Sequence, residues 1–178
     1  MNARDAIMAE FMRQYAKKDM QRITVKGLCE AAPVARTTFY AYFNNTDDVC
    51  EQIEDEIIGG LEAVTATVSK GNLPDMGFDL FMDAVEAYIK EHWSTIYAFL
   101  AAQPNARFIR KWKDNIILHF GERYPEKKSI PHYGAVAEIA ASSMIGAYTY
   151  WMEHPEEDGL REIKRLIHRL LDALVKLL

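Results

Sequence analysis

The 178-residue sequence has few of the features that mark secreted or membrane-spanning proteins. Its only two cysteines, Cys29 and Cys50, cannot form a disulfide framework. Both fall on predicted core faces, which favours small buried hydrophobic side chains over redox sensors. No run of about 18 apolar residues is present, so we expect no membrane-spanning helix. The first residues also lack the basic-then-apolar pattern of a signal peptide, and together these absences predict a cytoplasmic protein with no membrane partner.

Sequence motifs of catalysis and metal binding are missing as well. The five histidines form no pair at i, i+3 or i, i+4 spacing, and no cysteine pair lies near them (His92, His119, His132, His154 and His168). There is no phosphate-binding glycine motif and no Gly-x-Ser-x-Gly sequence. His119 and Glu122 share helical i, i+3 spacing, but one such pair is usually a surface contact. We therefore expect no catalytic residue, no metal and no cofactor, and a protein that is not an enzyme.

Helical periodicity dominates what the sequence does contain. No segment alternates with period two for long enough to suggest a strand, and the prolines fall between helical patterns (Pro33, Pro74, Pro104, Pro125, Pro131 and Pro155). These patterns predict an all-α protein of about nine helices. The expected ranges are 3–19, 25–32, 36–43, 47–68, 75–92, 94–102, 105–122, 132–152 and 156–177.

The stretch from residue 23 to residue 48 predicts a helix-turn-helix with a further helix behind it. Thr24 is a suitable N-cap for the first short helix, which buries Val25, Leu28 and Cys29. The Pro33-Val34-Ala35 sequence ends this helix, and a second helix follows at residues 36–43. The segment has the size and polarity of a unit that reads DNA.

The second short helix has two different faces. Phe39 and Phe43 are four residues apart, so they share a face and point into a core. Thr37 and Thr38 point away from that core, whereas three larger side chains flank them (Arg36, Tyr40 and Tyr42). Arginine can bind a guanine edge, and Thr or Tyr hydroxyls can bind bases or phosphates. The pattern predicts a recognition helix for the major groove.

Residues 4–60 resemble the N-terminal domain of the TetR (tetracycline-repressor-like) family of bacterial transcription regulators. The matching residues are Thr24, Val25, Lys26, Leu28, Ala31, Ala32, Arg36 to Tyr40, Tyr42, Phe43 and Asp47 to Val49. The sequence around residues 96–116 also resembles a C-terminal domain type found in regulators from Firmicutes. The resemblance implies an all-helical homodimer that binds a palindromic operator and releases it when a small molecule binds. It implies DNA contacts by Thr24, Lys26, Arg36, Thr37, Tyr40 and Tyr42.

Three positions depart from the family pattern. Pro33 replaces the usual turn glycine, and its fixed φ means that the turn must be built differently, with the first helix ending a residue early. Ala35 stands where Ser usually caps the recognition helix, at a cost of about 1 kcal/mol. Thr46, which we include with Thr38 among the DNA-contacting candidates, stands where many members carry a phosphate-binding Lys.

Charge and domain organisation agree with a DNA-binding head. The expected head, residues 1–46, holds seven basic and four acidic residues, a net charge of +3, while the rest carries −8. A basic head on an acidic body is typical of a protein that meets phosphate at one end, although ordinary scatter of surface charge would also produce it. We expect a helix-turn-helix domain at 1–46 and a regulatory and dimerisation domain at 47–178.

Two further patterns concern the second domain. From residue 160 onward an apolar stripe is wider than one core contact needs, and the preceding helix presents small residues along one face, so we expect a four-helix dimer interface. Burial of both faces within one monomer is the alternative.

Aromatic and methionine side chains between the expected DNA-binding domain and the dimer helices could line a cavity for an unidentified apolar or amphipathic effector (Phe81, Trp93, Tyr97, Trp112, Met144 and Tyr148). Core packing is the usual role of each such side chain.

The sequence therefore predicts a ligand-responsive DNA-binding regulator, a repressor that works as a homodimer on double-stranded operator DNA. The alternative is a helix-turn-helix protein that binds DNA weakly and acts mainly through protein partners. The departures at Pro33, Ala35 and Thr46 keep this alternative open.

Overall fold

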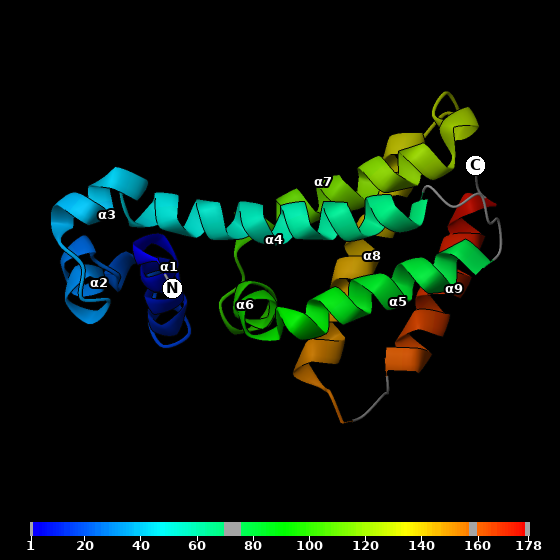
Figure 1. Ribbon diagram of the computed structural model, residues 1–178. Helices are drawn as coiled ribbons and strands as arrows, with labels where there is room; N and C mark the ends of the chain where they lie inside the picture. The colour runs from blue at the N-terminus through cyan, green and yellow to red at the C-terminus, as the bar shows by residue number, and fades with distance from the viewer. Residues whose placement is uncertain (1, 70–75, 157–159, 177–178) are drawn as a thin grey trace. The chain divides into compact units, whose positions relative to one another are not determined.

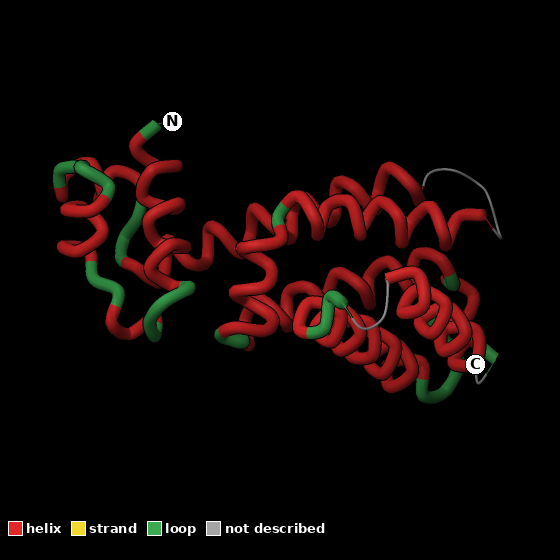
Figure 2. Tube along the Cα trace, turned by 90° about the horizontal axis from the view of Figure 1, so that it is seen from below, coloured by secondary structure: helices red, strands yellow, loops and turns green. Residues whose placement is uncertain are grey.

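The computed structural model describes residues 2–69, 76–156 and 160–176, and within these ranges every regular element is helical (Figures 1 and 2). The prediction of an all-α fold is confirmed. The α-helices are α1 (Ala3–Tyr15), α2 (Val25–Ala31), α3 (Arg36–Tyr42), α4 (Thr46–Ser69), α5 (Met76–Glu91), α6 (Trp93–Tyr97), α7 (Ala106–Arg123), α8 (Tyr133–Glu153) and α9 (Leu160–Val175). Residues 75, 157–159 and 177–178, which were expected to be helical, lie outside the described ranges.

The end of α1 and the segment after α6 depart from expectation for reasons that the structure shows. Helix α1 ends at Tyr15 rather than at residue 19, because the polar Lys17-Lys18-Asp19 sequence offers no apolar side chain to bury a further turn. The helix expected at 94–102 is α6 followed by one π-helical turn, Ala98–Ala102, in which the Gln103 amide donates to the Ala98 carbonyl over 3.0 Å. Hydrophobic periodicity cannot distinguish this i→i+5 turn from an α-helix, since both bury one side of the segment.

The chain forms two compact units, residues 1–59 and 60–178. The first unit therefore extends beyond residue 46, the boundary expected from sequence, and includes the first half of α4. This half contributes to the core of the unit through buried Val49, Cys50 and Ile53. The remaining core side chains come from the three preceding helices and include Ile7, Phe11, Leu28, Phe39 and Phe43, all at most 2% exposed.

The turn between α2 and α3 contains no left-handed residue. Helix α2 ends at Ala31, one residue before the expected end, and Ala32 has φ −93° and ψ 17°. The Val34 amide then donates to the Cys29 carbonyl over 3.0 Å and closes the turn. Since no residue here needs positive φ, Pro33 fits with its fixed φ, and the expectation that α2 ends early is confirmed.

The start of α3 has no side-chain cap. Ala35 occupies the N-cap with extended geometry, φ −69° and ψ 149°, and has no group that can accept a hydrogen bond from the first turn. By contrast, the Thr24 hydroxyl at the start of α2 accepts a hydrogen bond from the Gly27 amide over 3.1 Å. The first-turn amides of the candidate recognition helix therefore depend on solvent or on a bound partner.

The second unit, residues 60–178, packs α7 and α9 against α8. One core cluster contains Phe120, Val136, Ala137, Ala140 and Leu174. A second group is aromatic: the Trp112 ring stacks on Tyr148 with centroids 5.7 Å apart, and Phe108 meets Trp112 edge-on at 5.8 Å. Within the described ranges, no helix combines the length and apolarity needed to cross a membrane.

The two adjacent glycines of α4 have different surroundings. A Cβ on Gly60 would overlap the phenol ring of Tyr88, whereas a Cβ on Gly59 would meet no neighbouring atom within 4 Å. Close packing is therefore the role of Gly60. Gly59 has no such constraint, and it only carries the usual entropic disadvantage of glycine within a helix.

Alanine substitutions at these two glycines should have opposite effects on stability. Gly59→Ala should raise the free energy of unfolding by about 0.5–1 kcal/mol, because alanine loses less backbone entropy in a helix. Gly60→Ala should lower it, because the Tyr88 ring must move. Urea denaturation followed by circular dichroism measures both changes, and equal stabilisation by the two variants would contradict the close contact.

A serine at position 35 should stabilise the first unit. In Ala35→Ser the hydroxyl can accept a hydrogen bond from the first turn of α3, which should raise the free energy of unfolding by roughly 1 kcal/mol. Ala41→Ser, on an exposed position inside the same helix, is the matched control and should be neutral or slightly destabilising. Denaturation curves showing the same shift for both variants would argue against a missing cap.

Candidate DNA-binding surface and effector region

The exposed side of α3 carries four of the eight residues predicted to contact DNA. Tyr40 is 59% exposed and Tyr42 is 44% exposed, and Arg36 and Thr37 are also exposed. On the opposite side of the helix, Phe39 is fully buried. The helix therefore presents one cation and three hydroxyl groups from a rigid apolar support. This is the polarity and geometry that a major-groove recognition helix requires.

Two other candidates on this part of the chain are less accessible. Thr38 and Thr46 are both half-buried. Thr38 lies within α3, and Thr46 is the first residue of α4. Each of these two residues therefore has less exposed surface available for contact with DNA than Thr37 has.

Helix α2 presents Thr24 and Lys26 at its exposed first turn. Because the Thr24 oxygen accepts the capping hydrogen bond, its O–H remains a donor suited to a phosphate oxygen. The Lys26 ammonium lies 3.8 Å from the Glu30 carboxylate, and both side chains are more than two-thirds exposed. Such a pair contributes little to stability, so Lys26 can exchange Glu30 for a phosphate at small cost.

Arg4 joins α1 to α4 and was not singled out by sequence. Its Nη2 donates to Gln52 Oε1 over 2.8 Å, and its Nη1 lies 2.5 Å from Glu56 Oε1. The guanidinium carbon also lies 6.0 Å from the centroid of the Phe43 ring, directly after α3. A single side chain thus connects α1 with α4 and lies beside the residue that follows α3.

A second network joins the end of α3 to the start of α4. Asp48 Oδ2 accepts hydrogen bonds from the backbone amide and the side-chain amide of Asn44, both over 2.7 Å. Gln52 Nε2 donates to the Tyr42 carbonyl over 3.2 Å and to Asp48 Oδ1 over 3.0 Å. The Asn44 backbone hydrogen bond, followed by that of Gln52, lowers the pKa of the Asp48 carboxyl. The network is therefore complete at neutral pH and is lost as the pH falls through that lowered pKa.

The six residues predicted to contact an effector divide into two groups. Trp112, Met144 and Tyr148 are at most 5% exposed, and the Tyr148 hydroxyl donates to the Met82 sulfur over 3.6 Å. Burial raises the pKa of this hydroxyl, with a further contribution from the Glu86 carboxylate. The other three lie nearer the surface: Phe81 and Trp93 are half-buried and Tyr97 is 37% exposed.

Within the same unit, His119 links α4 to α7. Its Nε2 lies 2.7 Å from the Thr65 hydroxyl oxygen, and its Nδ1 lies 3.1 Å from Glu122 Oε2. The Thr65 hydroxyl also donates to the Leu61 carbonyl over 2.8 Å. The His119–Glu122 spacing noted in the sequence is thus part of a chain of polar contacts that ends on buried Thr65.

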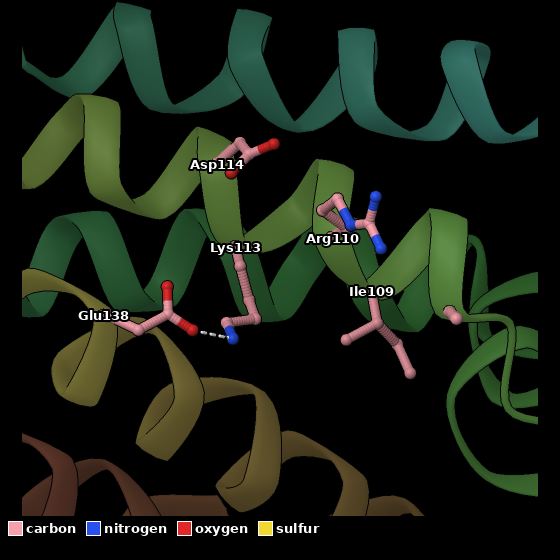
Figure 3. A pocket seen from close by; sticks show the side chains of 6 residues that line it. Ile109, Arg110, Lys113, Asp114 and Glu138 are labelled. Carbon is pink, nitrogen blue, oxygen red and sulfur yellow. Dashed lines mark hydrogen bonds and ion pairs between the residues drawn. The ribbon is translucent and has the colours of Figure 1, made fainter.

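An open groove of about 450 Å³ lies on α7 and α8, and none of its lining residues is one of the six aromatic and methionine candidates (Figure 3). Its lining includes Ile109, Arg110 and Asp114 from α7, together with the Lys113–Glu138 ion pair between the two helices. Opposite charges neutralise each other there. The part of the chain that the structure describes holds no group of three His, Cys, Asp or Glu side chains arranged to bind a metal ion.

Comparison with known proteins gives structural matches only. No protein-family model matches the sequence, and no curated protein matches it. The fatty acid degradation regulator FadR from Bacillus halodurans has a TM-score of 0.71 at 16% identity, covering 96% of this chain and 95% of that one. SmeT in its triclosan complex has a TM-score of 0.67 at 16% identity, covering 98% and 90%.

A third structure carries the family name in its description. The TetR family transcriptional regulator PfmR from Thermus thermophilus has a TM-score of 0.59 at 15% identity, covering 96% of this chain and 97% of that one. At these identities the likeness concerns the fold alone, yet it extends over both units. The chain has a TetR-like fold.

Proposed function

We propose that this protein is a DNA-binding transcriptional regulator, a repressor that binds a palindromic operator as a homodimer and releases it when a small molecule binds. The observation that carries the proposal is the exposed face of α3, on which Arg36, Thr37 and Tyr40 project from a helix anchored by buried Phe39 and Phe43. An enzyme would need side chains placed together for catalysis. In the part of the chain that the structure describes, the polar side chains discussed above instead form helix caps, ion pairs and links between helices.

The residues of the surface have distinct roles in this proposal. Arg36 reads a guanine edge in the major groove, and the Thr37 and Tyr40 hydroxyls bind neighbouring bases or phosphates. Thr24 and Lys26 bind the phosphate backbone at the start of α2, as does the Tyr42 hydroxyl at the end of α3. A phosphate near Ala35 would also accept hydrogen bonds from the uncapped first-turn amides of α3, so bound DNA would compensate for the missing serine.

The proposed dimer interface consists of one face of α8 and one face of α9. On α8, Ile139 is 50% exposed, and the small residues Ala135, Ser142 and Gly146 are exposed beside it. On α9, Leu166 is 57% exposed and Leu170 is 38% exposed. The other side of α9 packs within its own unit, through Ile163, Ile167 and Leu174. The expected division of the stripe into a core side and an outer side is thus present, although residues 177–178 lie outside the described ranges.

The proposed effector site lies among the buried aromatic and methionine side chains of the second unit. Two of the similar structures are described as a fatty acid degradation regulator and as a complex with triclosan, and by analogy we propose an apolar effector for this chain. In this chain Trp112 stacks on Tyr148 and Met144 is buried, so an effector must displace some of these side chains. Methionine side chains are well suited to this because they repack easily.

Substitutions in the two short helices should separate base reading from phosphate binding. Arg36→Ala should reduce discrimination between operator and random DNA by about 1–3 kcal/mol, whereas Lys26→Ala should weaken binding to all sequences and reduce the salt dependence. Glu30→Gln should strengthen binding to all sequences, because it removes a negative charge beside Lys26. Fluorescence anisotropy at several salt concentrations, with an operator selected from random oligonucleotides, measures these effects.

Arg161→Ala, at an exposed position of α9, is the control and should leave DNA binding unchanged. Equal loss on operator and random DNA for Arg36→Ala would show that Arg36 only contacts phosphate. A failure of the selection to enrich any sequence would favour the alternative of a helix-turn-helix protein that acts through protein partners.

Charged substitutions on the outer side of α9 should separate the subunits. The wild type should have twice the 20.4 kDa chain mass in light scattering at micromolar concentration. The double variant Leu166→Glu/Leu170→Glu should be monomeric, because burying two unpaired carboxylates costs several kcal/mol. Arg161→Glu changes the net charge by the same amount at a position on another side of the helix, and it should remain dimeric. A monomeric wild type would refute the interface.

A further inference from the structure

Asn115 is a buried polar residue that the fold of the monomer does not explain. It lies on α7, is 5% exposed, and its side-chain nitrogen has no hydrogen-bond partner among the described residues. Folded proteins pair nearly all of their buried polar groups, and an unpaired donor is explained by local strain, by a buried water or by a bound molecule. Most of the other buried α7 side chains are apolar, such as Phe108, Trp112 and Ile116. A buried asparagine among these apolar side chains is therefore not explained by core packing.

Helical spacing places the Asn115 amide in the interior of the second unit. Trp112 is three residues before Asn115 and His119 is four residues after it, so all three share one side of α7. The Trp112 ring stacks on Tyr148 of α8, and the His119 ring lies edge-on to Phe81 of α5 with centroids 6.4 Å apart. The amide is thus flanked, one turn in each direction, by side chains that contact other helices.

The surroundings of Asn115 define what kind of molecule could bind there. The neighbours one turn away are aromatic, and Met82 joins them through its contact with Tyr148. An amide N–H donor among such groups selects a hydrogen-bond acceptor attached to an apolar, preferably aromatic, body. A carboxylate would need a cation to compensate for its desolvation, but Lys90 and Lys164, the cations beside Glu86, are already paired with that carboxylate.

We propose that Asn115 is the polar anchor of the effector site and that the effector is an uncharged aromatic compound whose carbonyl oxygen accepts a hydrogen bond from the Asn115 side chain. The inference rests on the proposed function, since it assigns the chemistry of the same effector. It adds an amide donor to the six aromatic and methionine candidates, among which the Tyr148 hydroxyl already donates to Met82.

The position of Asn115 also connects the ligand to α4. Four residues of α-helix rise about 6 Å, so a molecule bound to Asn115 lies one turn from His119. His119 holds Thr65 of α4 through the 2.7 Å contact. A ligand that moves the His119 ring breaks this contact and releases α4 from α7 on this side. Asn115 is therefore a binding residue. His119 is a positioning residue, because it couples the presence of the bound ligand to the position of α4.

Calorimetric titration of the full-length protein with three matched probes tests the proposal. 2-Acetylnaphthalene carries a carbonyl, 2-isopropylnaphthalene has the same shape without an acceptor, and 2-naphthoate carries a charge. The wild type should bind the ketone about tenfold more tightly than the hydrocarbon, as expected for one buried hydrogen bond, and the carboxylate most weakly. Asn115→Leu should bind the ketone and the hydrocarbon equally.

Asn115→Ala is the second variant, because leucine is larger than asparagine and can disturb the packing. It should also lose the preference for the ketone. No preference in the wild type, a preference retained in both variants, tightest binding of the carboxylate, or no binding of any probe would each overturn the proposal. A strong loss of thermal stability in both variants, with the preference unchanged, would show that the amide instead holds a buried water.

The outcome can be separated from that of the proposed function. Operator binding by the wild type in the absence of probes is measured in the same samples by anisotropy. If the wild type shows no preference for the ketone but binds the operator, only the role of Asn115 is refuted. If it prefers the ketone but binds no DNA, the role of Asn115 stands and the proposed regulatory function is refuted.

Discussion

Around the apolar core of the N-terminal unit, the guanidinium group of Arg4 joins segments that are distant in the sequence. It holds Gln52 and Glu56 of α4 while lying over Phe43, the residue that ends α3. The Asp48 and Gln52 network adds a second connection between the same two helices. Both connections involve the first half of α4, so they favour a coupled orientation of α3 and that half of α4.

Much of this unit could be predicted from sequence, because its determinants are local. The Thr24 cap, the four-residue spacing of Phe39 and Phe43, and the early end of α2 at Pro33 each act over a few residues. The exposed side of α3 follows from the same spacing. Arg4 could not be predicted in this way, since its partners are 48 and 52 residues away and exposed arginines are common at any helix start.

The C-terminal unit was less predictable because its decisive contacts join distant segments. The sequence indicated its helices and the double-sided character of α9, yet it did not indicate the π-helical turn after α6, the contact of Gly60 with Tyr88, or the Thr65–His119 link. Asn115 escaped notice for a physical reason. An isolated asparagine in an amphipathic helix usually lies on the solvated side, and only the packing of α7 shows that this one is buried.

The acidic residues of α4 alter the electrostatics of the head. The compact unit of residues 1–59 carries seven basic and ten acidic residues, six of the latter between positions 47 and 56, so its net charge is −3 although residues 1–46 alone are positive. A unit of this charge is held only weakly by random DNA, whose attraction is mainly a matter of phosphate neutralisation. In the function proposed above, the protein would leave non-target sites quickly and search by repeated dissociation and rebinding rather than by long sliding along the duplex.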